Sequence, residues 1–337
     1  MFPEIQYHPS PDQRAIVAEL ETAIAEILPV SRLHKQRHES SSTWDALEDL
    51  GIFDLAVEEA LGGAGLGAVE EALLAAALGR QLASPSVFAK CGSAHAATRV
   101  EGRTAVAFTS RNGITLVREP DADVVLFRSG DKSALYAING EGTAFDGNPW
   151  LDEMGPCSGL GPKISKFDAD GLTRLRLIDA AALAGLAGAA LEMAVNYAQV
   201  REQFGRPIGT FQAIKHHCAN MAVAARQAID IVTFAATAFD HGREDVDFLV
   251  ESAFLTATEA ALENSGKNIQ IHGGIGFSDE SNAHLFLKRA NALIAIGGGT
   301  EAAVRRLEKL AVTVGAKRAP ANPRRRIHAG SDSHRCW

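Results

Sequence analysis

Cysteine is scarce in this sequence, and its four cysteines are not placed for metal binding or for a paired redox motif. They stand at Cys91, Cys157, Cys218 and Cys336, with no C-x-x-C spacing among them. A structural zinc site or a disulfide framework needs closely and regularly spaced ligands. The sequence therefore predicts free thiols in a reducing compartment and no metal site.

The sequence also lacks an excess of basic residues and a long uninterrupted apolar run. Its formal net charge is −8, which argues against nucleic acid as a partner because phosphate binding needs a basic face. The most apolar segment, AAALAGLAGAALEMAV, is too short to span a membrane and contains Glu192. The N-terminus shows no basic region followed by an apolar stretch. We expect a cytoplasmic protein without membrane insertion.

Helical periodicity is abundant and is interrupted by one β-rich region. Residues 1–100 predict a helical domain, in which Thr43 is expected to cap the helix of WDALEDL. Residues 101–171 predict a small β domain from the runs RTAVAFTS, GITLVREP, ADVVLFRSG, KSALYAING and GTAFDG. Residues 172–317 predict Ala-rich helices that suit a four-helix bundle. Residues 318–337 are basic and aperiodic, and we expect them to form a disordered tail. The fold class is α+β and mostly α.

In three stretches, glycines leave the backbone uncovered next to polar side chains. These stretches are REQFGRPIGTFQ, QIHGGIGF and ALIAIGGGTEAAVRR. Exposed backbone amides at such turns can face a phosphate or a flat ligand. Taken singly, each stretch is equally typical of an ordinary helix corner or C-cap.

Together, in this order and at these separations, the stretches resemble the acyl-CoA dehydrogenase family. REQFGRPIGTFQ resembles its Arg-x-x-Phe-Gly…Phe-Gln motif, and QIHGGIGF resembles its Gln-x-x-Gly-Gly-x-Gly motif. WDALEDLGIFDLAVEEALGGAGLG is similar to its helical N-terminal segment. The resemblance implies an N-terminal helical domain, a middle β domain and a C-terminal four-helix bundle, usually assembled as a tetramer with FAD at a subunit interface. It also implies a carboxylate base that removes a proton alpha to a thioester, while hydride leaves the beta carbon for flavin N5.

Carried over residue by residue, the resemblance implies contacts with FAD, largely with the flavin of a neighbouring subunit, for Arg201, Phe204, Gly205, Gln212, Gln270, Gly273 and Gly274. Thr300 matches a threonine close to the cofactor. Arg176 matches an arginine near the acyl-CoA pocket, although a solvated helix charge is the alternative interpretation.

The sequence departs from the family at the catalytic base. In many members a glutamate directly precedes the Gly-Thr pair on the last turn, and here that position is Gly298. In another branch the glutamate precedes the arginine that corresponds to Arg176, and here that position is Leu175. The middle domain is short and has no Gly-Ser-Asp after Glu119-Pro120. Both usual positions of the base are therefore vacant.

Some members of the family are α2β2 heterotetramers in which a short subunit without a base pairs with a full-length one, and many act on steroid side-chain CoA thioesters. The sequence resembles that short subunit. We expect it to complete the FAD site of a full-length partner that acts on an acyl-CoA and passes electrons to electron-transfer flavoprotein or a similar acceptor. Two alternatives remain open: a self-sufficient enzyme with a relocated base, Asp179 or Glu301, and a non-catalytic acyl-CoA-binding or scaffold protein.

Overall fold

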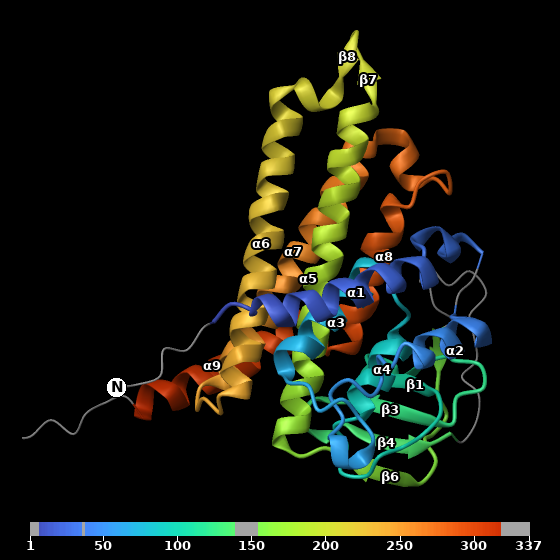
Figure 1. Ribbon diagram of the computed structural model, residues 1–337, viewed down its shortest axis with the longest axis vertical. Coiled ribbons are helices and arrows are strands. Elements are labelled where there is room, and N and C mark those ends of the chain that lie inside the picture. The colour runs from blue at the N-terminus through green and yellow to red at the C-terminus, as the bar shows by residue number, and fades with distance from the viewer. Residues whose placement is uncertain (1–6, 36–37, 139–153, 318–337) are drawn as a thin grey trace, which may run out of the picture.

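The computed structural model describes residues 7–35, 38–138 and 154–317. Long helices stand side by side, and one small sheet lies against their lower ends (Figure 1). The expected run GTAFDG and the expected tail at 318–337 lie outside the described residues.

The N-terminal domain is helical. Its elements are α1 (Pro11–Ile27), η1 (Val30–His34), α2 (Ser41–Asp49), η2 (Glu59–Leu61), α3 (Ala68–Arg80) and α4 (Pro85–Ser93). The expected cap of α2 is wrong, because Ser40 is the N-cap and its hydroxyl accepts from the backbone N–H of Thr43 at 3.2 Å. The run of serines before Thr43 offers several capping side chains, and the earlier one allows a longer helix.

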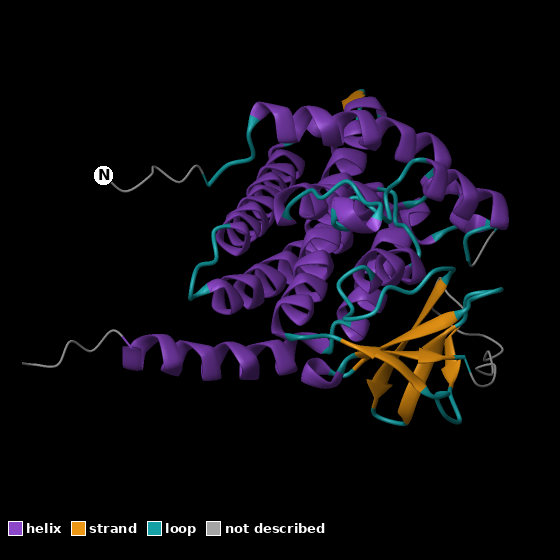
Figure 2. Cartoon of the chain, turned by 60° about the horizontal axis from the view of Figure 1, so that its bottom comes forward, coloured by secondary structure: helices purple, strands orange, loops and turns teal. Residues whose placement is uncertain are grey.

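The middle domain is a six-stranded sheet in the order β5-β2-β1-β3-β4-β6. The strands are β1 (Thr104–Ser110), β2 (Gly113–Val117), β3 (Val124–Arg128), β4 (Ala134–Ala137), β5 (Met154–Pro156) and β6 (Lys163–Lys166), with η3 (Gly130–Lys132) before β4. β1 and β3 run parallel, and the other neighbours are antiparallel. One face of the sheet packs against the helices through Val106, Phe108 and Leu126 (Figure 2).

The C-terminal domain is the bundle. Its helices are α5 (Ala169–Val200), α6 (Gln212–Asp240), α7 (Val246–His272), α8 (Ala283–Ile296) and α9 (Gly299–Lys317). The hairpin β7 (Glu202–Gln203) and β8 (Arg206–Pro207) with η4 (Ile208–Thr210) joins α5 to α6, and η5 (Gly273–Phe277) follows α7. α5 starts at Ala169, three residues before the expected boundary, because Asp168 caps it.

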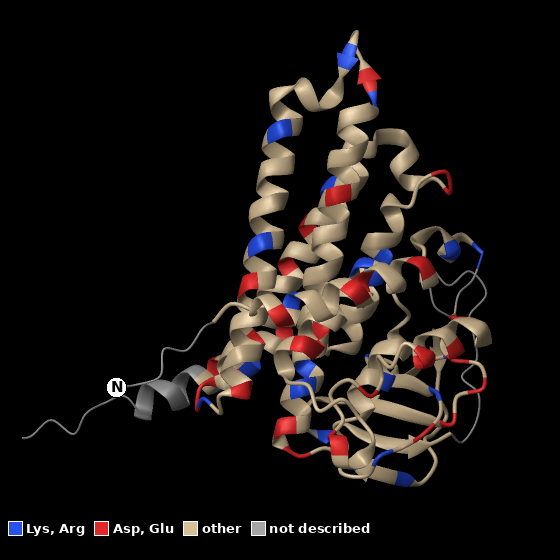
Figure 3. Cartoon of the chain, viewed as in Figure 1, with Lys and Arg blue, Asp and Glu red and all other residues tan. Residues whose placement is uncertain are grey.

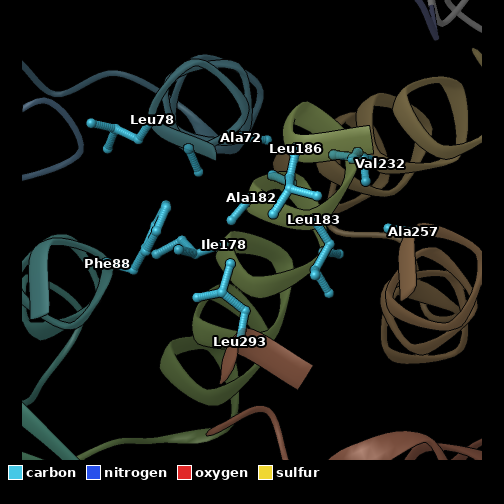
Figure 4. Close-up of a cluster of buried hydrophobic side chains, with 14 of the residues drawn as sticks. Ala72, Leu78, Phe88, Ile178, Ala182, Leu183, Leu186, Val232, Ala257 and Leu293 are labelled. Atoms are coloured by element: carbon cyan, nitrogen blue, oxygen red, sulfur yellow. The ribbon is translucent and has the colours of Figure 1, made fainter. Parts of the chain in front are cut away.

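α5 is the central helix of the core. It packs on α3, α6, α7 and α8, as the buried side chains around Ala182 and Leu186 show (Figure 4). Gly79 and Gly185 permit the close approach of α3 and α5, because an added Cβ would lie 2.1 Å and 1.9 Å from backbone oxygens of the other helix. α5 and α6 are long and apolar enough to cross a membrane by length and composition. The packing of α5 inside the protein accounts for its apolar character.

Candidate functional site

A cavity of about 610 Å³ lies between the sheet and the bundle. It is bounded by the ends of β1 and β3, the first turns of α5 and α7, and the turn from α8 to α9. Phe108, Leu172, Leu175, Val250 and Ile296 supply apolar walls. A partly open, largely apolar cavity of this size with a few converging polar groups is typical of a small-molecule site.

The glycine turn forms one wall of this cavity. Gly297 is required for packing, since an added Cβ would lie 2.8 Å from the ring of Phe254. Gly298 and Gly299 have φ of 91° and 81°, values that side-chain-bearing residues rarely adopt. An added Cβ at Gly298 would point into open space, with Nη1 of Arg306 at 3.9 Å as its nearest neighbour. The turn therefore presents backbone, and no carboxylate, to the cavity.

Arg176 holds this turn in place. Its Nε donates to Glu251 at 3.1 Å, its Nη1 donates to the carbonyl of Gly297, and its guanidinium lies 4.4 Å from the ring centre of Phe254. Burial lowers the pKa of Arg176 to about 10, while Glu251 and Asp179 oppose that shift. The alternative of a solvated helix charge is wrong, because the side chain is buried and lines the cavity. Its contact with an acyl-CoA stays a prediction.

Neither expected substitute base is available in the cavity. Asp179 is buried behind it in a two-point ion pair with Arg128, at 2.6 and 3.2 Å. The side chain of Glu301 is 88% exposed and pairs with Arg305. Leu175, which stands at the second usual position of the base, is apolar and packs against the sheet.

Sequence reasoning missed the two carboxylates that do line the cavity, Asp247 and Glu251. They lie four residues apart on α7, a spacing that places both on one helix face and that could have drawn attention to them. Glu251 accepts from Nε of Arg306 at 2.7 Å as well as from Arg176. Asp247 accepts from the hydroxyl of Thr173 at 2.6 Å. Both oxygens of Glu251 are engaged by the two guanidinium groups, so this carboxylate is not free to contact a substrate proton.

The first FAD motif lies at the opposite end of α5, on the β7–β8 hairpin (Figure 1). Phe204 and Gly205 form its two-residue turn, with φ of 56° and 77°. A bulky side chain is strained at such a φ, yet Phe204 is 91% exposed and meets the ring of Phe211 only edge-on, with ring centres 6.1 Å apart. A contact between this ring and another molecule would account for a phenylalanine at a strained and exposed position.

The second FAD motif lies at the end of α7, beside the first. Tyr197 of α5 stacks on His272 of α7 with ring centres 4.1 Å apart, and Ile208 and Ile271 share one apolar cluster. Gly273 and Gly274 have no atom within 4 Å of an added Cβ, so their backbone is open to a ligand.

We call this end of the bundle the tip. It comprises Arg201, Phe204, Gly205, Gln212, Gln270, Gly273, Gly274 and Phe277, which are all exposed. Guanidinium and amide donors, bare backbone and exposed rings suit the diphosphate and adenine of a dinucleotide. The tip therefore fits part of an FAD molecule.

The structure does not bring all the predicted cofactor residues together. Seven lie at the tip, whereas Thr300 lies in the first turn of α9 beside the cavity. Arg176 and Arg201 mark the two ends and are separated by ~37 Å along α5 at 1.5 Å per residue. Among the described residues, no group of three or more His, Cys, Asp or Glu side chains could hold a metal ion.

Comparison with known proteins gives two family matches. Residues 10–101 match "Acyl-CoA dehydrogenase, N-terminal domain", and residues 167–309 match "Acyl-CoA dehydrogenase, C-terminal domain". Acyl-CoA dehydrogenase IpdE2 of Mycobacterium tuberculosis is 31% identical over 286 residues, covering 79% of this chain and 86% of IpdE2. Acyl-CoA dehydrogenase FadE34 of the same organism is 42% identical over 132 residues, 39% of this chain and only 19% of FadE34.

Two solved structures share the fold. The ChsE4-ChsE5 complex from Mycobacterium tuberculosis gives a TM-score of 0.72 at 22% identity, covering 94% of this chain and all of the matched chain. A variant of the "Tcur3481-Tcur3483 steroid ACAD" gives a TM-score of 0.71 at 22% identity, covering 90% of this chain and 99% of the matched chain.

Proposed function

This chain belongs to the acyl-CoA dehydrogenase family, and we propose that it is the subunit without a base in a heteromeric enzyme, where it completes the flavin site of a full-length partner. FAD is the cofactor of the family. When bound, the flavin supplies the chemistry of hydride acceptance from the beta carbon of an acyl-CoA.

One observation carries the proposal: the cavity has no carboxylate free to act as a base at either usual position. Gly298 offers only backbone, and Leu175 is packed in the apolar core. A general base must reach the proton through a direct contact or one water molecule. Asp179 cannot do so while both its oxygens are held by Arg128.

The tip is the part of this chain that serves the partner. Arg201, Gln212 and Gln270 would donate to the diphosphate and adenine of the partner's FAD, and the open backbone at Gly273 and Gly274 would let the cofactor approach closely. The exposed rings of Phe204 and Phe277, 91% and 77% accessible, would exclude water from that contact. These residues bind and orient the cofactor, while the partner supplies the base.

The names of two structural neighbours support a heteromer. One is a complex of two different chains, ChsE4 and ChsE5, and the other is described as a steroid ACAD of two components. We propose by analogy an α2β2 assembly in the cytoplasm, an acyl-CoA substrate of steroid side-chain type, and electron-transfer flavoprotein or a similar protein as acceptor.

Two other functions are less well supported. A self-sufficient enzyme would need a relocated base, and Asp179 and Glu301 are both engaged elsewhere. A scaffold protein would not need Phe204 in a strained and exposed turn.

The test is the flavin content per chain, measured with native mass, for this chain alone and co-expressed with a full-length homologue. We expect flavin only in the mixed complex, near one FAD per pair of unlike chains. A full complement of flavin in the chain alone would contradict the proposal and favour the self-sufficient enzyme. Absence of flavin from a stable mixed complex would favour the scaffold.

A further inference from the structure

We propose that the cavity of this chain binds the carboxylate of an apolar acid at the place left open by the missing base. This binding site is separate from the tip and from the dehydrogenation itself. In this proposal, the carboxylate of the ligand occupies the space beside Gly298 that a side chain at that position would fill.

The charge of the cavity is the first step. Four cationic side chains line it, Arg128, Arg176, Arg306 and Lys309, against the carboxylates of Asp247 and Glu251. Asp179 lies behind the wall and pairs with Arg128, whereas Arg176 and Arg306 share the one carboxylate of Glu251. Two guanidinium groups around a single carboxylate leave positive charge beside an apolar wall, which favours an anionic ligand.

The direction of Arg306 is the second step. Glu251 engages its Nε at 2.7 Å and its Nη2 at 3.3 Å, which fixes the guanidinium plane. The remaining amine, Nη1, is the atom nearest to the Cβ position of Gly298, at 3.9 Å. The opening that a side chain at 298 would use therefore faces a donor on a positioned cation, and guanidinium groups bind carboxylates strongly.

The apolar walls of the cavity determine the chemical character of the ligand beyond its carboxylate. Phe108, Leu172, Val250, Ala295 and Ile296 line the cavity, and its volume of about 610 Å³ lies in the range of small-molecule pockets. The expected ligand is an apolar monocarboxylic acid, with its body between the sheet and α7.

The experiment compares octanoate with 1-octanol by isothermal titration calorimetry on the full-length chain. Both probes are unbranched chains of eight carbons, and only octanoate carries a charge. We expect one octanoate per chain, bound at least about tenfold more tightly than 1-octanol, because a hydrogen bond to a charged group contributes this much. Equal affinities, or no binding of octanoate, would overturn the proposal.

Variants locate the site. Arg306→Gln should weaken octanoate about tenfold and leave 1-octanol unchanged, whereas Arg306→Lys should keep most of the preference because it retains the charge. Arg305→Gln is the matched control, since Arg305 is the preceding residue of α9 but pairs with the exposed Glu301. An equal effect of Arg305→Gln and Arg306→Gln would contradict the assignment to the cavity. If Arg306→Gln does not fold, the preference of the wild type and of Arg306→Lys for octanoate still decides the question.

Discussion

Glu119 is a buried carboxyl group whose ionisation opposes folding. Its Oε1 accepts from Nε1 of Trp44 at 2.9 Å, and its Oε2 has no hydrogen-bond partner among the described residues. Burial, with a smaller contribution from Glu39, raises the pKa of Glu119 to about 7, although the hydrogen bond from Trp44 and the charge of Arg103 oppose the shift. The folded state therefore holds a proton that the unfolded state releases near pH 4.5, so this contribution to stability falls as the pH rises from about 4.5 to about 7.

Glu119→Gln should remove that dependence, because an amide keeps the acceptor for Trp44 and carries no charge. We expect the variant to be more stable than the wild type at pH 8, by at most about 3 kcal/mol, with a difference that shrinks toward pH 4.5. Urea unfolding at several pH values measures it. Glu101→Gln, at an exposed position, is the control and should show no such trend. A difference independent of pH would show that Glu119 does not titrate in this range.

The glycine turn provides a second prediction at this scale. Gly297→Ala should destabilise the chain by about 1–3 kcal/mol, because the methyl group collides with the ring of Phe254. Gly298→Ala meets no atom closer than 3.9 Å but must adopt a φ of 91°, which costs roughly 1 kcal/mol. Chemical denaturation should rank Gly297→Ala as the more damaging. The reverse order would mean that backbone strain outweighs packing at this turn.

At the scale of single elements, the β7–β8 hairpin should contribute to assembly and little to folding. Phe204→Asn removes the exposed ring and places at this turn a residue that tolerates positive φ. We expect the isolated chain to gain about 1 kcal/mol of stability, while the mixed complex retains less flavin. Thermal unfolding and flavin absorbance measure the two effects.

Phe254→Ala is the contrasting variant, because that ring is fully buried. It should cost about 3–5 kcal/mol in the isolated chain. A loss of stability of similar size in Phe204→Asn would show that the hairpin is part of the fold's own core.

The elements that sequence could predict are those with a strong period or strong turn chemistry. The long helices and the strands β1 to β4 have such patterns. β5 (MGP) and β6 (KISK) contain few of the β-branched and aromatic residues that favour strands, and their identity depends on pairing with β2 and β4. The start of α2 is not determined by local sequence, because neighbouring hydroxyl side chains compete for one capping position.

The site could be predicted only as far as motifs extend. The vacant positions at Leu175 and Gly298 follow from motifs that resemble those of the family, and so does the expectation that each of the two tip motifs contacts FAD. The pairing of Glu251 with Arg176 and Arg306 joins residues 75 and 55 positions apart. No local pattern encodes such a contact, because it depends on how α5, α7 and α9 pack.

At the scale of the whole molecule, the two ends of α5 lie in regions that differ in their content of charged residues. Charged residues of both signs gather where the bundle meets the sheet, and fewer lie on the upper helices, although the β7–β8 hairpin carries several (Figure 3). The cavity belongs to the charged end, and the tip to the other. Sites this far apart, without shared partners, should respond independently to substitution.

This separation gives the last prediction, which concerns the one cofactor residue away from the tip. If the chain serves only the flavin of its partner, Thr300→Ala should leave the flavin content of the mixed complex unchanged, because Thr300 lies at the cavity end. Arg201→Gln should lower it if the exposed guanidinium at the tip binds the diphosphate as proposed. The measurement is flavin absorbance per complex after gel filtration, with native mass to confirm that both variants still assemble. Equal losses in the two variants would mean that the chain's own cavity also holds a flavin, and the absence of a base at Gly298 would then have to be explained within a self-sufficient enzyme.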